Sequence, residues 1–131
     1  MDLDKDSGCF VCGQENSTGL QAVFNWDQEN LRSCCRLTLD ERFQGWEGVV
    51  HGGVIASLLD EACVYAGRSL AETLVTAELS VRYRKPVPVG REVAVHGEVL
   101  EQRRKVLKVR AKLEVDGELH VEANARIFLL D

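Results

Sequence analysis

Two periods of hydrophobic residues alternate along the chain. Between about Gly53 and Gly67, apolar positions recur every three or four residues, which predicts a helix. Nearly all the remaining positions in this stretch are also small or apolar, so the helix is expected to be buried. Elsewhere the period is two, which predicts strands at Leu20–Trp26, Leu31–Leu39, Leu79–Tyr83, Val93–Val99, Leu107–Val115 and Leu119–Leu129.

Proline and glycine residues between these segments predict where the strands end and turn. Pro86 and Pro88 should end the third strand, and Asp116-Gly117 is a strong signal for a two-residue hairpin. One helix can cover this many strands only if the sheet curls around it. We therefore predict an α+β fold with a curved antiparallel sheet wrapped around one long central helix. The edge strands of such a sheet need cover, which favours a dimer.

The 131 residues fit a single domain spanning 1–131. Residues 1–19 are expected to be a tail and a loop, and residues 40–50 a second loop. Hydrophobic residues make up 45% of the chain and charged residues 28%, as in a globular protein. The net charge of −5 argues against nucleic-acid binding. No apolar stretch reaches the ~20 residues that span a bilayer, and the acidic start does not resemble a signal peptide, so a cytoplasmic location is expected.

The chemistry concentrates in the segment HGGVIASLLD, residues 51–60. The first N–H groups of a helix lack internal partners and carry its positive dipole end. Gly52 and Gly53 place no side chain there, so a ligand oxygen can approach the backbone. Asp60 lies on the same helix, where an ionised carboxylate is costly unless it is hydrogen-bonded. It is either a catalytic carboxylate or a structural group bonded to a strand hydroxyl or loop amide. Glu61, about 100° away around the helix, is expected to be a satisfied or solvated acid.

Three motifs then resemble one family. They are the string FxGxxGxVHGG from Phe43 to Gly53 with VIASLLDEA after it, TAELSVRYRKPVPVG at residues 76–90, and the opening CFVCG. Together they resemble the PaaI-type branch of hotdog-fold acyl-CoA thioesterases, over most of the chain. The resemblance implies hydrolysis of acyl-CoA to free acid and CoA. It further implies a carbonyl bound at the Gly52 N–H, Asp60 as base or nucleophile, and Thr76 as a hydroxyl partner of the carboxylate. Many relatives have an Asn in the loop before HGG; here Gln44 could take over its substrate-binding role, or that role could be absent.

The spacing of these residues sets a constraint. Gly52 and Asp60 are eight positions apart, or ~12 Å along one helix. One thioester carbonyl cannot meet both groups of the same chain. A composite site is therefore predicted, with Gly52 from one subunit and Asp60 and Thr76 from its partner, and the resemblance implies the same arrangement. The expected minimal unit is a homodimer, and the expected assembly a homotetramer.

Other residues are assigned to the substrate. His51 is expected to orient the loop or contact substrate, Ser57 lies on the small-residue stripe that contains Asp60, and basic side chains could hold CoA phosphates. The basic candidates are Arg82, Arg84 and Arg104. No metal or redox cofactor is expected. Cys9-x-x-Cys12 could begin a zinc site, but the only second pair, Cys34-Cys35, should point to opposite strand faces.

Two other functions remain open. A hotdog dehydratase or hydratase could use His51 and Glu61 to move a proton and water. A non-catalytic acyl-CoA-binding module would bind ligand without releasing CoA.

Overall fold

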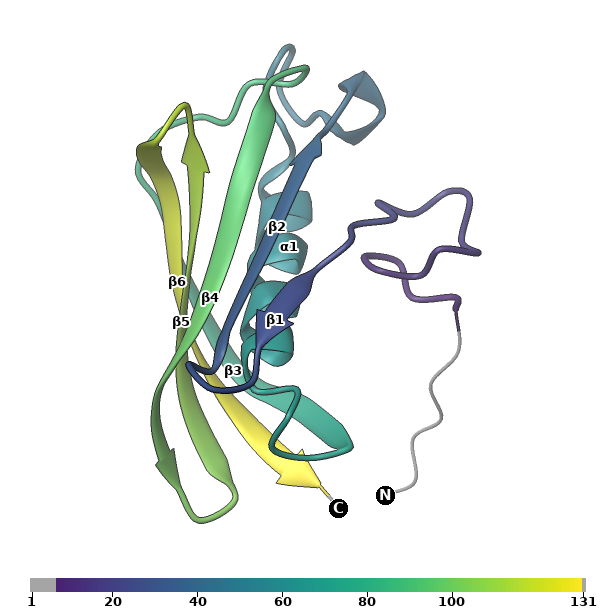
Figure 1. The fold of residues 1–131 in the computed structure, drawn as a ribbon. Coiled ribbons are helices and arrows are strands. Elements are labelled where there is room, and N and C mark those ends of the chain that lie inside the picture. Colours follow the sequence, from purple (N-terminus) through teal and green to yellow (C-terminus); the bar gives the residue numbers. More distant parts are fainter. Residues whose placement is uncertain (1–6, 131) are drawn as a thin grey trace.

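The computed structural model describes residues 7–130, which form one antiparallel six-stranded sheet and one long helix (Figure 1). The strands lie in the order β1-β2-β4-β5-β6-β3. Their bounds are β1 Asn25–Asp27, β2 Arg32–Thr38, β3 Thr73–Tyr83, β4 Glu92–Arg103, β5 Val106–Val115 and β6 Glu118–Leu130. A short 3₁₀ turn, η1, covers Glu41–Phe43. The predicted α+β architecture is confirmed.

Helix α1, Gly52–Ala66, lies against one face of the sheet (Figure 1). Buried apolar side chains of both elements form the core between them. The contact is close, because Ser33 Oγ donates a hydrogen bond to the Ala62 carbonyl over 2.6 Å. A Cβ atom at Gly97 of β4 would lie 2.3 Å from the same carbonyl oxygen, so glycine is needed there. No helix within residues 7–130 is long and apolar enough to cross a bilayer. The buried helix residues are Ile55, Leu58, Leu59, Ala62, Cys63 and Ala66.

The C-terminal strands follow the predicted alternation. β5 and β6 place alternate apolar residues in the core and mostly polar or charged residues on the outer face, where Phe128 is an apolar exception. Asp116 and Gly117 have φ angles of 52° and 78°, the left-handed values that a two-residue hairpin turn requires, so the predicted hairpin is confirmed. β3 ends before Pro86 and Pro88, as predicted.

β3 is longer than its alternation predicted, because it begins at Thr73 rather than near Leu79. The pairing register between β3 and β6 shifts between Thr76 and Glu78, which marks a β-bulge. An extra residue reverses the face that later positions address. Thr76 and Leu79 therefore both face the helix side of the sheet, although their numbers differ in parity.

The strand predicted at Leu20–Trp26 is wrong over its first five residues, since β1 begins only at Asn25. The N–H groups of Leu20 and Ala22 donate instead to carbonyls of the preceding loop, and Gln21 has a φ of 50°. Residues 9–19 form the predicted loop. The predicted tail falls mainly on residues 1–6, which lie outside the described residues.

β3 is an edge strand. It pairs with β6 on one side, and none of the other described strands pairs with its second side. An edge of eleven residues offers a row of backbone donors and acceptors that a second chain can pair with. The predicted dimer stays a prediction, and this edge is the surface that it would cover.

Candidate active site

The start of α1 presents one available backbone N–H. His51 caps the helix, and its Nδ1 accepts a hydrogen bond from the Gly53 N–H over 2.9 Å. The His51 carbonyl accepts from Val54 and Ile55. Within residues 7–130 no group accepts a hydrogen bond from the Gly52 N–H. Because the Gly53 N–H is occupied, Gly52 is the donor that remains for a ligand oxygen.

Tyr83, at the end of β3, supports this helix start. Its hydroxyl donates a hydrogen bond to the Gly52 carbonyl over 2.6 Å. Partial burial raises the pKa of Tyr83, so the phenol stays protonated and remains a donor. The sequence alone does not predict this contact. The alternation identified Tyr83 as a strand residue, but only the path of β3 past α1 brings it to Gly52.

An open hollow of about 410 Å³ adjoins Gly52. Trp46 at its rim is 86% exposed, which leaves an indole ring free to cover a ligand. The Gln44 side-chain oxygen accepts a hydrogen bond from the Gly48 N–H over 3.2 Å, so the Gln44 side chain stabilises its own loop. Ser57 Oγ donates to the Gly53 carbonyl over 2.9 Å. The lining residues are Gly45, Trp46, Val50, His51 and Gly52.

Asp60 and Thr76 meet on the flank of α1 that faces β3. Thr76 Oγ1 donates a hydrogen bond to Asp60 Oδ1 over 2.6 Å, and both side chains are half-buried. The bulge next to Thr76 turns its hydroxyl toward the helix. This bond fixes one carboxylate oxygen and leaves the second oxygen to accept a proton from water or to attack a carbonyl carbon.

Gly52 and Asp60 occupy one continuous helix, as the spacing argument assumed. Their separation of ~12 Å along the axis is about four times the reach of one reacting group. The hollow at Gly52 does not include Asp60 or Thr76. One chain therefore holds two half-sites rather than one assembled site.

The three candidate arginines do not come together in one chain. Arg84 Nε pairs with Glu122 over 2.9 Å just beyond β3, and Arg82 lies near that end of the strand. Arg104 forms the turn between β4 and β5, with a φ of 56°. The strand register aligns this turn with Val75, near the other end of β3 and roughly 23 Å from Arg82.

The second acid of the helix, Glu61, faces the N-terminal loop. Cys9 Sγ lies 3.6 Å from Glu61 Oε2 as a hydrogen-bond donor. Burial, and then the Glu61 carboxylate, raise the pKa of the Cys12 thiol to about 12. Glu61 is thus a satisfied acid, as expected. Cys34 is exposed and Cys35 buried, so this pair does point to opposite faces of β2.

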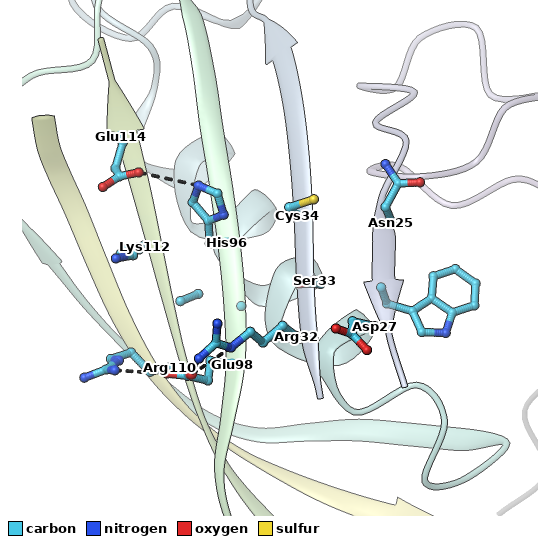
Figure 2. Close-up of a pocket in the computed structure, with 13 residues that line it drawn as sticks. Asn25, Asp27, Arg32, Ser33, Cys34, His96, Glu98, Arg110, Lys112 and Glu114 are labelled. Atoms are coloured by element: carbon cyan, nitrogen blue, oxygen red, sulfur yellow. Dashed lines mark hydrogen bonds and ion pairs between the residues drawn. The ribbon is translucent and has the colours of Figure 1, made fainter. Parts of the chain in front are cut away.

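A further hollow, of about 670 Å³, lies across β1, β2, β4 and β5 (Figure 2). Figure 2 shows ion pairs from Arg32 and Arg110 to Glu98, and His96 Nε2 facing Glu114 at 3.4 Å. The hollow contains none of the predicted site residues. A self-neutralised surface of this kind gives no indication of a catalytic role.

Comparison with known proteins identifies the family. The model of the thioesterase superfamily matches residues 47–121, more than half of the chain. Acyl-coenzyme A thioesterase THEM4 is 27% identical in Bos taurus and 32% identical in Mus musculus, over 93% of this chain in both cases. These matches cover 51% and 54% of the THEM4 chains, so this chain spans about half the length of these curated relatives.

Solved structures with a similar fold support this family assignment. A thioesterase superfamily protein has a TM-score of 0.85 at 26% identity, covering 95% of this chain and 61% of its own. Phenylacetic acid degradation protein PaaI from Thermus thermophilus has a TM-score of 0.72 at 19% identity, covering 76% of this chain and 86% of its own. A Streptococcus mutans protein bound to acetyl CoA has a TM-score of 0.75 at 18% identity, covering 83% of this chain and 86% of its own. The chain therefore belongs to the thioesterase superfamily, with the PaaI-type hotdog fold that its motifs predicted.

Proposed function

We propose that this protein hydrolyses acyl-CoA thioesters to a free acid and CoA. The observation that carries the proposal is the Asp60 carboxylate held by the Thr76 hydroxyl at 2.6 Å, on the same helix whose first N–H, at Gly52, is available to a ligand. The names of the THEM4 relatives and the acetyl CoA bound by the Streptococcus mutans protein support the same substrate class.

The proposed site is shared between two subunits. The second edge of β3 is the surface at which a partner would add its own β3, extending the sheet. In such a dimer the Gly52 N–H of one chain would polarise the thioester carbonyl. Asp60 and Thr76 would come from the other chain. Two equivalent sites result from one twofold axis.

The chemistry follows from these positions. With the carbonyl oxygen on the Gly52 N–H, negative charge that develops in the tetrahedral transition state is stabilised by roughly 3 kcal/mol. Asp60 either takes a proton from the attacking water or attacks the carbonyl itself to form an anhydride that water then cleaves. The carbon–sulfur bond breaks in both routes, and the CoA thiolate leaves and takes up a proton. Water is the only co-reactant, so the mechanism requires no metal or redox cofactor.

Arg104 is the best placed of the candidate arginines for the CoA phosphates. It lines an open hollow of about 610 Å³ whose other residues are mainly basic, whereas Arg84 is already paired with Glu122. Clustered guanidinium and ammonium groups suit a polyphosphate. The hollow is lined by Glu101, Arg103, Arg104, Val106, Lys108 and Arg126.

A thiol-release assay tests the proposal. Aryl, short-chain and long-chain acyl-CoAs are offered to the wild type and to Asp60→Asn, which keeps the side-chain shape and an oxygen for Thr76. At least one substrate should release CoA in an Asp60-dependent manner. If none does, hydrolysis is not the function. Tight acyl-CoA binding without release would favour a binding module, and turnover of an enoyl-CoA would favour a hydratase.

A further inference from the structure

We propose that Cys9, Cys12 and Glu61 form a zinc-binding site that fixes the N-terminal loop to the flank of α1. The site lies outside the proposed catalytic groups, and the inference holds whatever the activity of Asp60. It also revises the expectation from the sequence that no metal is bound. A second cysteine pair is not needed, because the helix supplies the third ligand.

The three ligand atoms lie close enough together for one ion to contact all of them. The two Sγ atoms and a Glu61 carboxylate oxygen all lie within 4.8 Å of one another. Zn–S bonds of ~2.3 Å and Zn–O bonds of ~2.0 Å in a tetrahedron place S and O about 3.5 Å apart, and two S atoms about 3.8 Å apart. The distance from Cys9 Sγ to Glu61 Oε2 is 3.6 Å. An ion would thus need little movement of the chain.

The loop that carries the two cysteines directs backbone donors at the Cys9 sulfur. The N–H groups of Val11 and Cys12 point at Cys9 Sγ, at 3.4 and 3.5 Å, and such donors stabilise a negatively charged sulfur. The Gly13 N–H closes the turn on the Cys9 carbonyl over 2.9 Å. A Cβ atom at Gly13 would lie 2.4 Å from the Cys9 nitrogen, so the turn depends on glycine. The spacing C-x-x-C-G therefore has a structural purpose.

The electrostatics of the cluster favour a cation. The Glu61 carboxylate lies half-buried beside the two thiols. Within residues 7–130 no basic side chain forms an ion pair with Glu61. A divalent ion would neutralise the carboxylate and displace the two thiol protons to solvent.

The ligand set selects the ion. Two thiolates favour a thiophilic metal, and zinc accepts a carboxylate as third ligand at tetrahedral geometry. No other Cys, His, Asp or Glu of residues 7–130 joins the group, so water would take the fourth position. The ion would link a loop that has no regular secondary structure to the central helix.

Metal binding to the reduced full-length protein tests the site. The protein is stripped with a chelator, its free thiols are counted, and it is titrated with Zn²⁺ against a chromophoric chelator. Wild type should bind about one zinc per chain. Co²⁺ should give the thiolate charge-transfer band and the intense d–d bands of a tetrahedral site. These readouts do not depend on catalysis.

Variants assign the ligands. Cys9→Ser and Cys12→Ser should weaken zinc binding by about 100-fold or more, and Glu61→Gln by about tenfold, while Cys34→Ser, a matched exposed thiol, should bind like wild type. Glu61→Gln lies within a helix and guards against a folding defect in the loop variants. The inference is overturned if fully reduced wild type binds no zinc, or if the Cys9 and Cys12 variants bind as well as Cys34→Ser. Loss of two thiols per chain in air, with no zinc bound after reduction, would mean a disulfide instead.

Discussion

Asp60 and Glu61 are neighbours on one helix, yet they face different regions of the molecule. Asp60 points to the edge strand β3 and accepts a hydrogen bond from Thr76 at 2.6 Å. Glu61 points to the N-terminal loop and lies 3.6 Å from the Cys9 thiol. The ~100° between successive helical residues makes this divergence unavoidable. The partners around each acid, rather than its own chemistry, decide what it can do.

The two surroundings differ in kind. A single hydroxyl orients one oxygen of Asp60 and leaves the other free for a reacting atom. Two soft sulfur atoms beside Glu61 make a ligand set instead. The Asp60 flank also lies next to the unpaired edge of β3, where a partner subunit can complete a site, whereas the Glu61 flank is covered by the chain's own loop.

The largest expected effect is on kcat, and it distinguishes the role of Asp60 from that of Glu61. Asp60→Asn should lower kcat for acyl-CoA hydrolysis by about 10³-fold or more, because the base or nucleophile is lost. Glu61→Gln should lower it by less than about fivefold, because that carboxylate faces away from the thioester. Steady-state thiol release checks both variants. The reverse pattern would mean that Glu61, rather than Asp60, is the base or nucleophile.

The next effect concerns the donor at the helix start. Gly52→Pro deletes the N–H, and proline suits the first helical position, particularly after His51 with its ψ of 133°. The variant should lose about 10²- to 10³-fold in kcat. Gly52→Ala is the control, because it keeps the N–H and its Cβ would meet Tyr83 at an ordinary 3.4 Å. Equal losses in both variants would argue for a steric cause.

A smaller effect is expected at Thr76. Thr76→Val removes the hydroxyl but keeps the shape, so Asp60 loses its orienting bond and kcat should fall about tenfold. Thr76→Ser should restore most of the rate. Separate measurement of kcat and of KM in the two variants checks this. A change in KM alone would show that Thr76 contacts substrate rather than orienting the carboxylate.

The smallest effect is on stability at high pH. Burial and Asp60 raise the pKa of Cys63 to about 12, and burial raises that of Cys35 to about 11, from an ordinary value of 9.0. As pH rises, these thiols ionise in the unfolded chain before they ionise in the folded chain. Their contribution to the free energy of unfolding is therefore fully present below about pH 9 and is lost as pH rises toward 12. The metal-free protein should lose about 1 kcal/mol between pH 8 and 10 from Cys63 alone. Urea unfolding at the two pH values measures it. Constant or rising stability would contradict the burial argument.

The sequence predicted the parts of this site that depend on local pattern. Helical periodicity placed Gly52 and Asp60 on α1, and glycine at the helix start indicated the open N–H. It did not predict where Thr76 points, because the bulge at 76–78 reverses the alternation of β3. Nor did it predict the approach of Cys9 to Glu61. The loop 9–19 has no periodicity, and its position follows from tertiary contacts alone.

The central claim is that each site combines Gly52 of one subunit with Asp60 of the other, and subunit mixing tests it most directly. Gly52→Pro and Asp60→Asn are each nearly inactive alone. In a freely exchanged equimolar mixture, half the dimers are mixed and each regains one intact site, so roughly a quarter of wild-type activity should return. If both groups acted within one chain, or the protein were a monomer, mixing would restore nothing.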